Sequence, residues 1–196
     1  DMEIYDHVTP TFLAGRSRLL HNAQLIVLDT NIPAESIAWL ADNVKLPIFA
    51  DPVSTAKAEK LRPVLGKLHT LKPNRLEAEL LSGVAITDQK SLDKAVDVLL
   101  STGLRRVFIS LGADGVYAAA HNHRLHVPCC PGTMVNTTGC GDAAMAAIAR
   151  AYLEGTGLEG TARAAMAAGS IAMESAETIN PDMSAQALKA RAEQLQ

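Results

Sequence analysis

A glycine-rich loop that carries one carboxylate is the part of the sequence best suited to chemistry. The loop runs through Asn136–Asp142 (Asn-Thr-Thr-Gly-Cys-Gly-Asp) and leads directly into the alanine-rich segment Ala143–Ala147. The unpaired backbone N–H groups of a helix's first turn form an anion site, and Gly139 and Gly141 let a ligand approach the backbone and permit a positive φ. With Asp142 at the junction, the pattern suits phosphoryl transfer, which depends mostly on positioning and charge stabilisation. It is equally typical of a plain turn whose acidic residue interacts with the helix dipole.

A second candidate follows an apolar run that ends at Leu71. Asn74 and Glu77 have the spacing of a capping box, in which each side chain bonds the backbone N–H of the other residue. The same two residues share one side of a first helical turn, where they could hold Mg²⁺ and its waters on nucleotide phosphates. Asp51 could support the same region through water, or could cap the turn before Pro52. These alternatives stay open.

A third candidate is the turn Ser110–Gly115 (Ser-Leu-Gly-Ala-Asp-Gly), which lies between two apolar segments of strand type. A turn with these glycines is typical of a hairpin. The alternative is a turn in which Ser110, Gly112 and Gly115 lie against nucleotide phosphates.

The three candidates, in this order and spacing, resemble the signatures of the ribokinase (PfkB) family of sugar and nucleoside kinases, from about Leu25 to Pro181. The resemblance implies in-line transfer of the γ-phosphoryl group of ATP to a primary hydroxyl of a small molecule. Further segments resemble members that act on the 5′-hydroxyl of pseudouridine, with another ribonucleoside or a free sugar as alternative acceptors. These segments are Asp1–Ile4, Asp51–Ser54, Leu71–Glu79 and Asn180–Ser184.

The resemblance also implies a role for each residue of the motifs. Asp142 resembles the catalytic base, and Gly139, Cys140 and Gly141 resemble the anion hole. The remaining residues resemble ligands of the cofactors: Asn74 and Glu77 for Mg²⁺, and Asn74, Ser110, Gly112, Gly115 and Thr138 for the nucleotide. These roles agree with elementary chemistry, because a hydroxyl needs a nearby carboxylate to accept its proton and developing negative charge needs preorganised N–H donors.

Two residues depart from the family's pattern. The loop begins with Asn136 where relatives carry an aspartate that helps to bind a monovalent cation, so K⁺ activation is an open question for this chain. Cys140 stands where relatives carry alanine or glycine. It is either a small filler beside the backbone or a redox-sensitive thiol, because a helix N-terminus lowers a thiol's pKa.

The N-terminal strands, small lid and glycine-pair motif of the family have no counterpart in this sequence. We therefore expect residues 1–196 to be the C-terminal part of a single ribokinase-like kinase domain, with the nucleotide-binding half and the catalytic base. A nucleotide-binding fragment without catalysis is the alternative from another functional class. Whether the protein forms a homodimer is an open question, because the lid that often mediates dimers in this family has no counterpart in this sequence.

Composition sets broad limits on the partners and the location. The chain is 48% hydrophobic and 20% charged, which is typical of a globular protein. Its net charge of −3 provides no basic stripe for nucleic acid or an anionic membrane, and no apolar run is long enough for a membrane span. Three cysteines, two of them adjacent, indicate a reducing compartment, so we expect a cytoplasmic location.

Alternating strands and helices must position the candidate residues. Strands are predicted at residues 25–29, 47–50, 69–72 and 106–111, with a hairpin at 116–120 and 124–129; helices are predicted at 33–43, 55–68 with a break or bend at Pro63, 74–81, 91–102, 142–154, 158–174 and 184–195. The alternation predicts an α/β fold, and the resemblance implies its three-layer form, with a mainly parallel central sheet flanked by helices. Ligands gather at the carboxyl ends of such strands, where we expect the three candidates to converge.

His121, His123 and His126 lack further ligands at metal-site spacing, so we expect them to be structural or solvent-facing.

Overall fold

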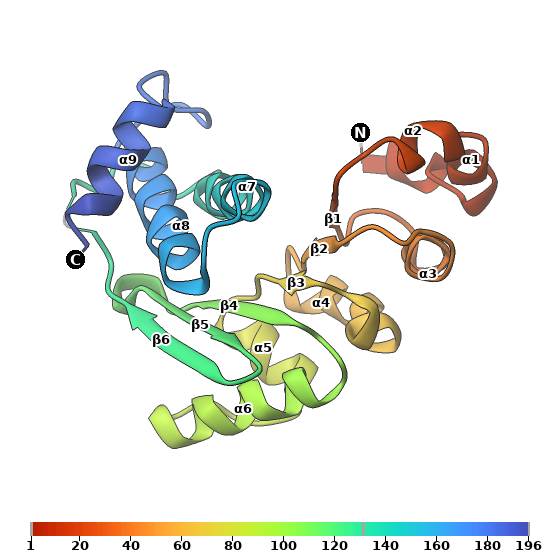
Figure 1. The fold of residues 1–196 in the computed structure, drawn as a ribbon, viewed down its shortest axis with the longest axis horizontal. Helices are drawn as coiled ribbons and strands as arrows, with labels where there is room; N and C mark the ends of the chain where they lie inside the picture. The colour runs from red at the N-terminus through yellow and green to blue at the C-terminus, as the bar shows by residue number, and fades with distance from the viewer. Residues whose placement is uncertain (1, 131, 196) are drawn as a thin grey trace. The chain divides into compact units, whose positions relative to one another are not determined.

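The computed structural model describes residues 2–130 and 132–195, so Asp1, at the start of one resembling segment, lies outside the described residues. The chain divides into two compact units, Asp1–Ile109 and Ser110–Gln196. Their elements are labelled in Figure 1.

Four parallel strands form the sheet of the first unit: β1 (Ile26–Asp29), β2 (Ile48–Asp51), β3 (Thr70–Leu71) and β4 (Arg106–Ser110). They pair in chain order, with Ile26 opposite Ile48, Phe49 opposite Thr70, and Thr70 opposite Arg106. Because parallel strands end at the same edge of a sheet, the residues that follow β2 and β3 are brought together there. This confirms the predicted parallel arrangement.

Helical segments connect the strands of the first unit and precede β1. The connections are α3 (Ala34–Asn43), α4 (Thr55–Ala58), the 3₁₀ segment η2 (Glu59–Lys67), α5 (Arg75–Ser82) and α6 (Gln89–Ser101). Ahead of β1 lie three short elements for which the sequence analysis makes no prediction: η1 (Met2–His7), α1 (Pro10–Ala14) and α2 (Ser17–His21).

The predicted helix at residues 55–68 is a single α-turn followed by a 3₁₀ run that contains Pro63. Proline has no N–H to donate and its ring excludes the carbonyl four residues earlier, so a regular α-helix cannot pass through it. At the end of this run, a Cβ on Gly66 would collide with the Thr102 carbonyl oxygen just after α6. Glycine therefore permits the close approach of η2 to the end of α6.

The core of the first unit is built on both faces of its sheet. Phe49, Leu71 and Phe108 on the strands are fully buried, as are Val96 and Leu99 on α6. Continuous burial along a strand is typical of a parallel sheet that is covered on both faces.

The second unit combines an antiparallel hairpin with three helices. The 3₁₀ turn η3 (Gly112–Asp114) leads into β5 (Val116–Ala120), which pairs with β6 (His123–Val127). The helices are α7 (Cys140–Leu153), α8 (Leu158–Met173) and α9 (Ala185–Glu193). Helices α7 and α8 lie side by side, and α9 packs on α8 (Figure 1).

Small side chains let α7 and α8 pack closely. Ala147 and Ala151 of α7 are buried, and so are Ala165, Ala168 and Gly169 of α8. Helix α7 begins two residues earlier than predicted, so Asp142 is its third residue rather than its first. Among the described residues, no helix combines the length and the apolar character that crossing a membrane requires.

Candidate active site

A buried ion pair lies at the carboxyl edge of the first unit's sheet. Asp51 is the last residue of β2, and Lys72 follows β3, where its N–H donates to the Ala50 carbonyl at 3.1 Å. The Lys72 Nζ lies 2.9 Å from the Asp51 Oδ2, and the two side chains are only 8% and 17% exposed. Because desolvating two charges is costly, such a pair persists only with close geometry and further partners.

The second oxygen of Asp51 stabilises a strained turn. Its Oδ1 accepts the Val53 N–H at 3.0 Å, and the Thr30 hydroxyl donates to the Pro52 carbonyl at 2.5 Å. Val53 has a φ of +63°, which a β-branched residue rarely adopts. The predicted capping role of Asp51 is therefore present in the structure, in addition to its ion pair.

Asn74 and Glu77 form the predicted capping box at the start of α5. The Asn74 Oδ1 accepts the Glu77 N–H at 2.9 Å, and the Glu77 Oε2 accepts the Asn74 N–H at 2.8 Å. Asn74 is exposed, whereas Glu77 is buried. Burial raises the pKa of Glu77, and the negative charge of Asp51 raises it further. The cap therefore places a second carboxylate within electrostatic reach of Asp51 and Lys72.

This group of side chains fits a hydrated divalent cation. Asp51, Asn74 and Glu77 offer hard oxygen ligands, and two neighbouring carboxylates share a single lysine as their nearby counter-charge. The single side-chain oxygen of Asn74 and one oxygen of Glu77 already accept a backbone N–H, and the two oxygens of Asp51 contact Lys72 and the Val53 N–H. Since Mg²⁺ keeps several waters and takes few protein carboxylates, bonds to its waters suit these residues. The sequence analysis missed Lys72, although a lysine between a buried strand and a capping box is a usable signal.

In the second unit, the start of α7 presents backbone donors to solvent. Gly139 caps the helix with a φ of +83°, and a Cβ there would lie 2.7 Å from the Thr178 carbonyl oxygen. The Cys140 N–H reaches the Thr137 carbonyl at 3.3 Å, whereas the N–H groups of Gly141 and Asp142 have no hydrogen-bond acceptor among the described residues. Two donors at the positive end of a long helix can bind an anion.

Asp142 lies beside these donors and is exposed. Its carboxylate is therefore accessible to a ligand held by the Gly141 and Asp142 N–H groups. Of the two loop glycines, Gly139 has a positive φ and Gly141 does not.

Cys140 is a packing residue. Its side chain is half-buried, and its Sγ lies 3.9 Å from the Asn136 carbonyl oxygen. Burial raises the pKa of the Cys140 thiol, which favours the role of a small filler over that of a redox-sensitive thiol.

Hydrogen bonds hold the Asn136–Gly139 loop against the segment that follows α8. The N–H groups of Val135 and Asn136 both donate to the Met173 carbonyl, at 2.8 and 3.1 Å. The Asn136 Oδ1 accepts the Thr138 N–H at 3.0 Å, and its Nδ2 donates to the Ala176 carbonyl at 3.3 Å. Thr138, a predicted nucleotide ligand, is thus held by its backbone and is exposed.

The Ser110–Gly115 turn is closed by its own backbone, because the Leu111 N–H donates to the Gly115 carbonyl at 2.8 Å. Gly112 and Gly115 have φ values of +65° and +91°. A Cβ on Gly115 would collide with the Val127 carbonyl oxygen. Glycine is thus required structurally at this position, while the contact of the turn with a nucleotide stays a prediction.

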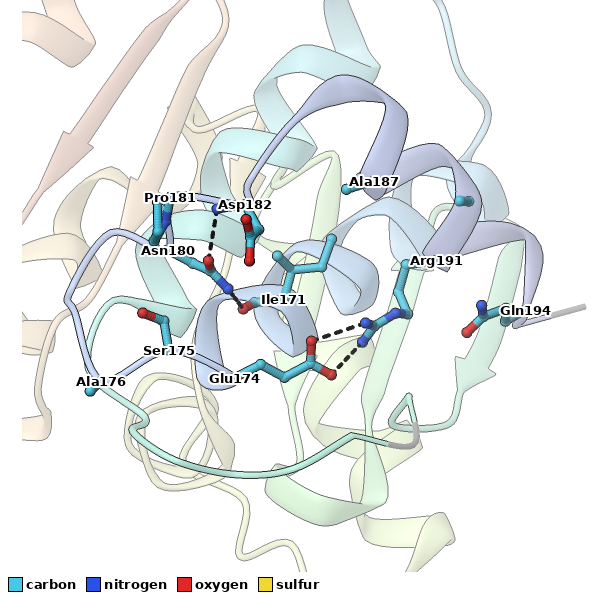
Figure 2. Close-up of a pocket in the computed structure, with 11 residues that line it drawn as sticks. Ile171, Glu174, Ser175, Ala176, Asn180, Pro181, Asp182, Ala187, Arg191 and Gln194 are labelled. Atoms are coloured by element: carbon cyan, nitrogen blue, oxygen red, sulfur yellow. Dashed lines mark hydrogen bonds and ion pairs between the residues drawn. The ribbon is translucent and has the colours of Figure 1, made fainter.

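A cavity of about 750 Å³ opens between the end of α8, residues 174–182 and α9 (Figure 2). Arg191 pairs with Glu174 through two bonds of 2.8 and 3.0 Å and also donates to the Ser170 hydroxyl at 2.6 Å. Buried Asn180 donates to the Ile171 carbonyl at 2.6 Å and accepts the Asp182 N–H at 2.9 Å. The sequence analysis missed this cavity, and none of the predicted site residues lines it.

The three histidines His121, His123 and His126 are all exposed. The His126 ring contacts the Asp114 carbonyl. Within residues 2–130 and 132–195, no three His, Cys, Asp or Glu side chains lie together in a way that could hold a metal ion.

Comparison with known proteins places this fold and these motifs in one family. Residues 13–185 match the profile "pfkB family carbohydrate kinase", and the chain belongs to that family. It is 39% identical over 187 residues to a pseudouridine kinase of Escherichia coli (strain K12), a match that covers 94% of this chain and 59% of the relative. Membership implies ATP as the phosphoryl donor together with a divalent cation.

Two solved structures share the fold. A putative sugar kinase from Clostridium perfringens superposes with a TM-score of 0.89 at 33% identity, over 94% of this chain and 58% of that protein. A ribokinase from Thermotoga maritima superposes with a TM-score of 0.84 at 24% identity, over 96% and 62%. The predicted ribokinase-like α/β fold is thus confirmed, and the chain spans about three fifths of the length of these relatives.

Proposed function

We propose that the protein containing this chain is a kinase that transfers the γ-phosphoryl group of ATP to the 5′-hydroxyl of pseudouridine. The observation that carries the proposal is the start of α7, where two unpaired N–H groups lie beside the exposed carboxylate of Asp142. Family membership supports the type of reaction. The identity to a pseudouridine kinase supports the acceptor.

In the proposed mechanism, Asp142 accepts the proton of the acceptor hydroxyl as that oxygen attacks the γ-phosphorus. The bond from the γ-phosphorus to the bridging oxygen breaks, and ADP leaves with that oxygen. The N–H groups of Gly141 and Asp142 stabilise the charge on the transferred phosphoryl group. Gly139 fixes their direction because its left-handed conformation starts the helix.

The residues at the edge of the first unit's sheet have a separate part in the proposal. Asn74, Glu77 and Asp51 would hold a hydrated Mg²⁺, which would supply positive charge against the phosphate groups. Lys72 keeps the Asp51 carboxylate in place through their 2.9 Å ion pair. In this proposal, Ser110, Gly112 and Gly115 contact the nucleotide.

A second candidate acceptor is a free sugar or another ribonucleoside. The observation that favours it is the similarity to a putative sugar kinase at 33% identity. This candidate keeps the same base, donors and cation ligands, and it changes only the molecule that supplies the hydroxyl. A nucleotide-binding fragment without catalysis is the third possibility, in which ATP binds and no ADP forms.

The test is ADP release by the full-length protein with Mg²⁺ and one acceptor at a time: pseudouridine, uridine, adenosine, ribose or fructose 6-phosphate. We expect the highest kcat/KM with pseudouridine. A clear preference for another acceptor would replace pseudouridine and retain the kinase. ATP binding without ADP release for any acceptor would contradict the proposed activity.

A further inference from the structure

The Asn136 side chain connects the loop before α7 with the segment after α8. Its amide is bonded at both ends, with the oxygen accepting the Thr138 N–H at 3.0 Å and the nitrogen donating to the Ala176 carbonyl at 3.3 Å. The first bond lies within the loop before α7, and the second reaches the segment after α8. One half-buried side chain therefore connects them.

The chemistry of this connection does not fit a monovalent cation. A cation site needs oxygen lone pairs that converge on one point, as a carboxylate and a carbonyl would provide. At Asn136 the atom that faces the Ala176 carbonyl is an amide nitrogen, which is a donor with no lone pair to offer. The Nδ2–H of Asn136 already donates to the Ala176 carbonyl, so this carbonyl oxygen has a partner within the protein.

An aspartate at this position would reverse the situation. One carboxylate oxygen would still accept the Thr138 N–H, and the other would face the Ala176 carbonyl oxygen with like charge. Two acceptors with no proton between them repel each other, and a bound cation would relieve the repulsion. The amide of Asn136 therefore makes the connection that a carboxylate makes only with a cation.

The connection matters because the same segment positions the anion-binding donors. Val135 and Asn136 donate their N–H groups to the Met173 carbonyl at 2.8 and 3.1 Å. Gly139 packs so closely on Thr178 that a Cβ would lie 2.7 Å from its carbonyl oxygen. Residues 173–178 thus fix the loop two to three residues before the N–H groups of Gly141 and Asp142. Catalysis by such donors depends on their preorganisation.

We propose that Asn136 is a positioning residue that takes the place of a monovalent cation beside the loop, so that phosphoryl transfer by this protein does not depend on K⁺. The activity part of this inference rests on the proposed function. The structural part rests only on the bonds of Asn136.

The test compares the full-length wild-type protein with Asn136→Asp, in KCl and in choline chloride of equal ionic strength. Two quantities are measured, the melting temperature without nucleotide or acceptor and kcat with the acceptor that gives the highest rate. Asn122→Asp, at an exposed position in the β5–β6 turn, adds the same charge to the same unit and serves as the control.

For the wild type and for Asn122→Asp, we expect the same melting temperature in both salts. We also expect the kcat values in the two salts to agree within about twofold, a difference that corresponds to less free energy than one hydrogen bond contributes. For Asn136→Asp, we expect KCl to raise the melting temperature and to restore a kcat that falls by about tenfold or more in choline chloride.

Three results would overturn the inference. The first is a wild-type protein that is stabilised or activated by KCl over choline chloride. The second is an Asn136→Asp protein that responds to K⁺ in neither quantity, and the third is an Asn122→Asp protein that acquires the same response. If no acceptor is phosphorylated, the proposed function fails, while the melting temperatures still decide the role of Asn136.

Discussion

At the scale of single residues, the ion pair of Lys72 and Asp51 has the highest energetic consequence. The Lys72 and Asp51 side chains are only 8% and 17% exposed, and the buried carboxylate of Glu77 lies close enough for the Asp51 charge to add to the effect of burial in raising the pKa of Glu77. The positive charge of Lys72 therefore compensates the negative charges of the neighbouring Asp51 and Glu77 carboxylates. Removing one partner of such a pair leaves an uncompensated buried charge, which costs more than the pair itself contributes.

We expect Lys72→Met to lower the free energy of unfolding by about 3 kcal/mol, because Asp51 and Glu77 would then repel each other without compensation. The measurement is urea unfolding at neutral pH. Lys67→Met is the matched control, since the Lys67–Asp42 pair has side chains 49% and 55% exposed; an exposed pair should cost less than about 1 kcal/mol. Equal losses of unfolding free energy for Lys72→Met and Lys67→Met would contradict the view that burial makes the Lys72–Asp51 pair more important for stability than an exposed pair.

His69 should make stability depend on pH. Its ring stacks on Phe49 with centroids 5.2 Å apart, and burial, followed by the charges of Arg106 and Arg105, lowers its pKa from 6.5 to about 4. Because the unfolded chain then takes up a proton more readily than the folded one, the stabilisation is complete above pH 6.5 and is lost as the pH falls toward 4. The ring is half-buried, so solvent screening reduces the effect to about 1–2 kcal/mol.

Unfolding free energies at neutral pH and near pH 4.5, measured for the wild type and His69→Gln, test this prediction. The wild type should lose more stability than His69→Gln over this interval, by about 1–2 kcal/mol. His123→Gln, at an exposed position of β6, should behave as the wild type does. Parallel pH profiles for all three proteins would show that His69 is not the titrating group.

At the scale of elements, the sequence predicts local features well and tertiary contacts poorly. The Asn74–Glu77 cap is predictable because both partners lie within one turn, and the strand–helix alternation is predictable from hydrophobic periodicity. The 3₁₀ character of residues 59–67 is harder to predict, because Pro63 excludes an α-helix without indicating what replaces it. The Lys72–Asp51 pair depends on which strands are neighbours, a property of the whole sheet.

The bonds of Asn136 show the same limit. Its partner, Ala176, lies 40 residues further along the chain, and an alanine carbonyl leaves no signal in a sequence. The cavity beside α9 likewise depends on Asn180 and Arg191, which contact α8 only after the chain has folded back.

The Ser110–Gly115 turn permits a prediction at this scale, because its two glycines differ in their surroundings as well as in backbone conformation: Gly115 has a φ of +91° with a ψ of −139°. Both have a positive φ, but a Cβ on Gly112 would meet nothing within 4 Å, whereas one on Gly115 would lie 2.8 Å from the Cys129 nitrogen and closer still to the Val127 carbonyl oxygen. Gly112→Ala should therefore cost about 1–2 kcal/mol for the left-handed backbone alone.

Gly115→Ala should cost more than about 3 kcal/mol, because the end of β6 and the residues that follow it must also shift. Urea unfolding of the two variants checks the difference. If Gly115→Ala is as stable as Gly112→Ala, the close approach of residues 127–129 is not present in solution.

At the scale of the whole molecule, the chain spans about three fifths of the length of its relatives, and each of its two units carries some of the predicted site residues. The group of Asp51, Lys72, Asn74 and Glu77 belongs to the first unit. The base and the anion-binding donors belong to the second. The convergence of the three motifs on one ATP, and the assignment of residues 1–196 to the C-terminal part of a kinase domain, stay predictions. Activity of the full-length protein is therefore the test of both units together.

The most direct measurement of the central claim is kcat of the full-length protein carrying Asp142→Asn, with ATP, Mg²⁺ and the acceptor that the wild type prefers. Asparagine has nearly the same shape and cannot accept the proton, so kcat should fall by a factor of about 10²–10⁴. ATP affinity, measured by equilibrium binding, should be retained. Glu154→Gln, just after the end of α7, where Glu154 pairs with exposed Arg150, should keep the full rate. Full activity of Asp142→Asn would show that Asp142 is not the base and would contradict the account of the α7 site.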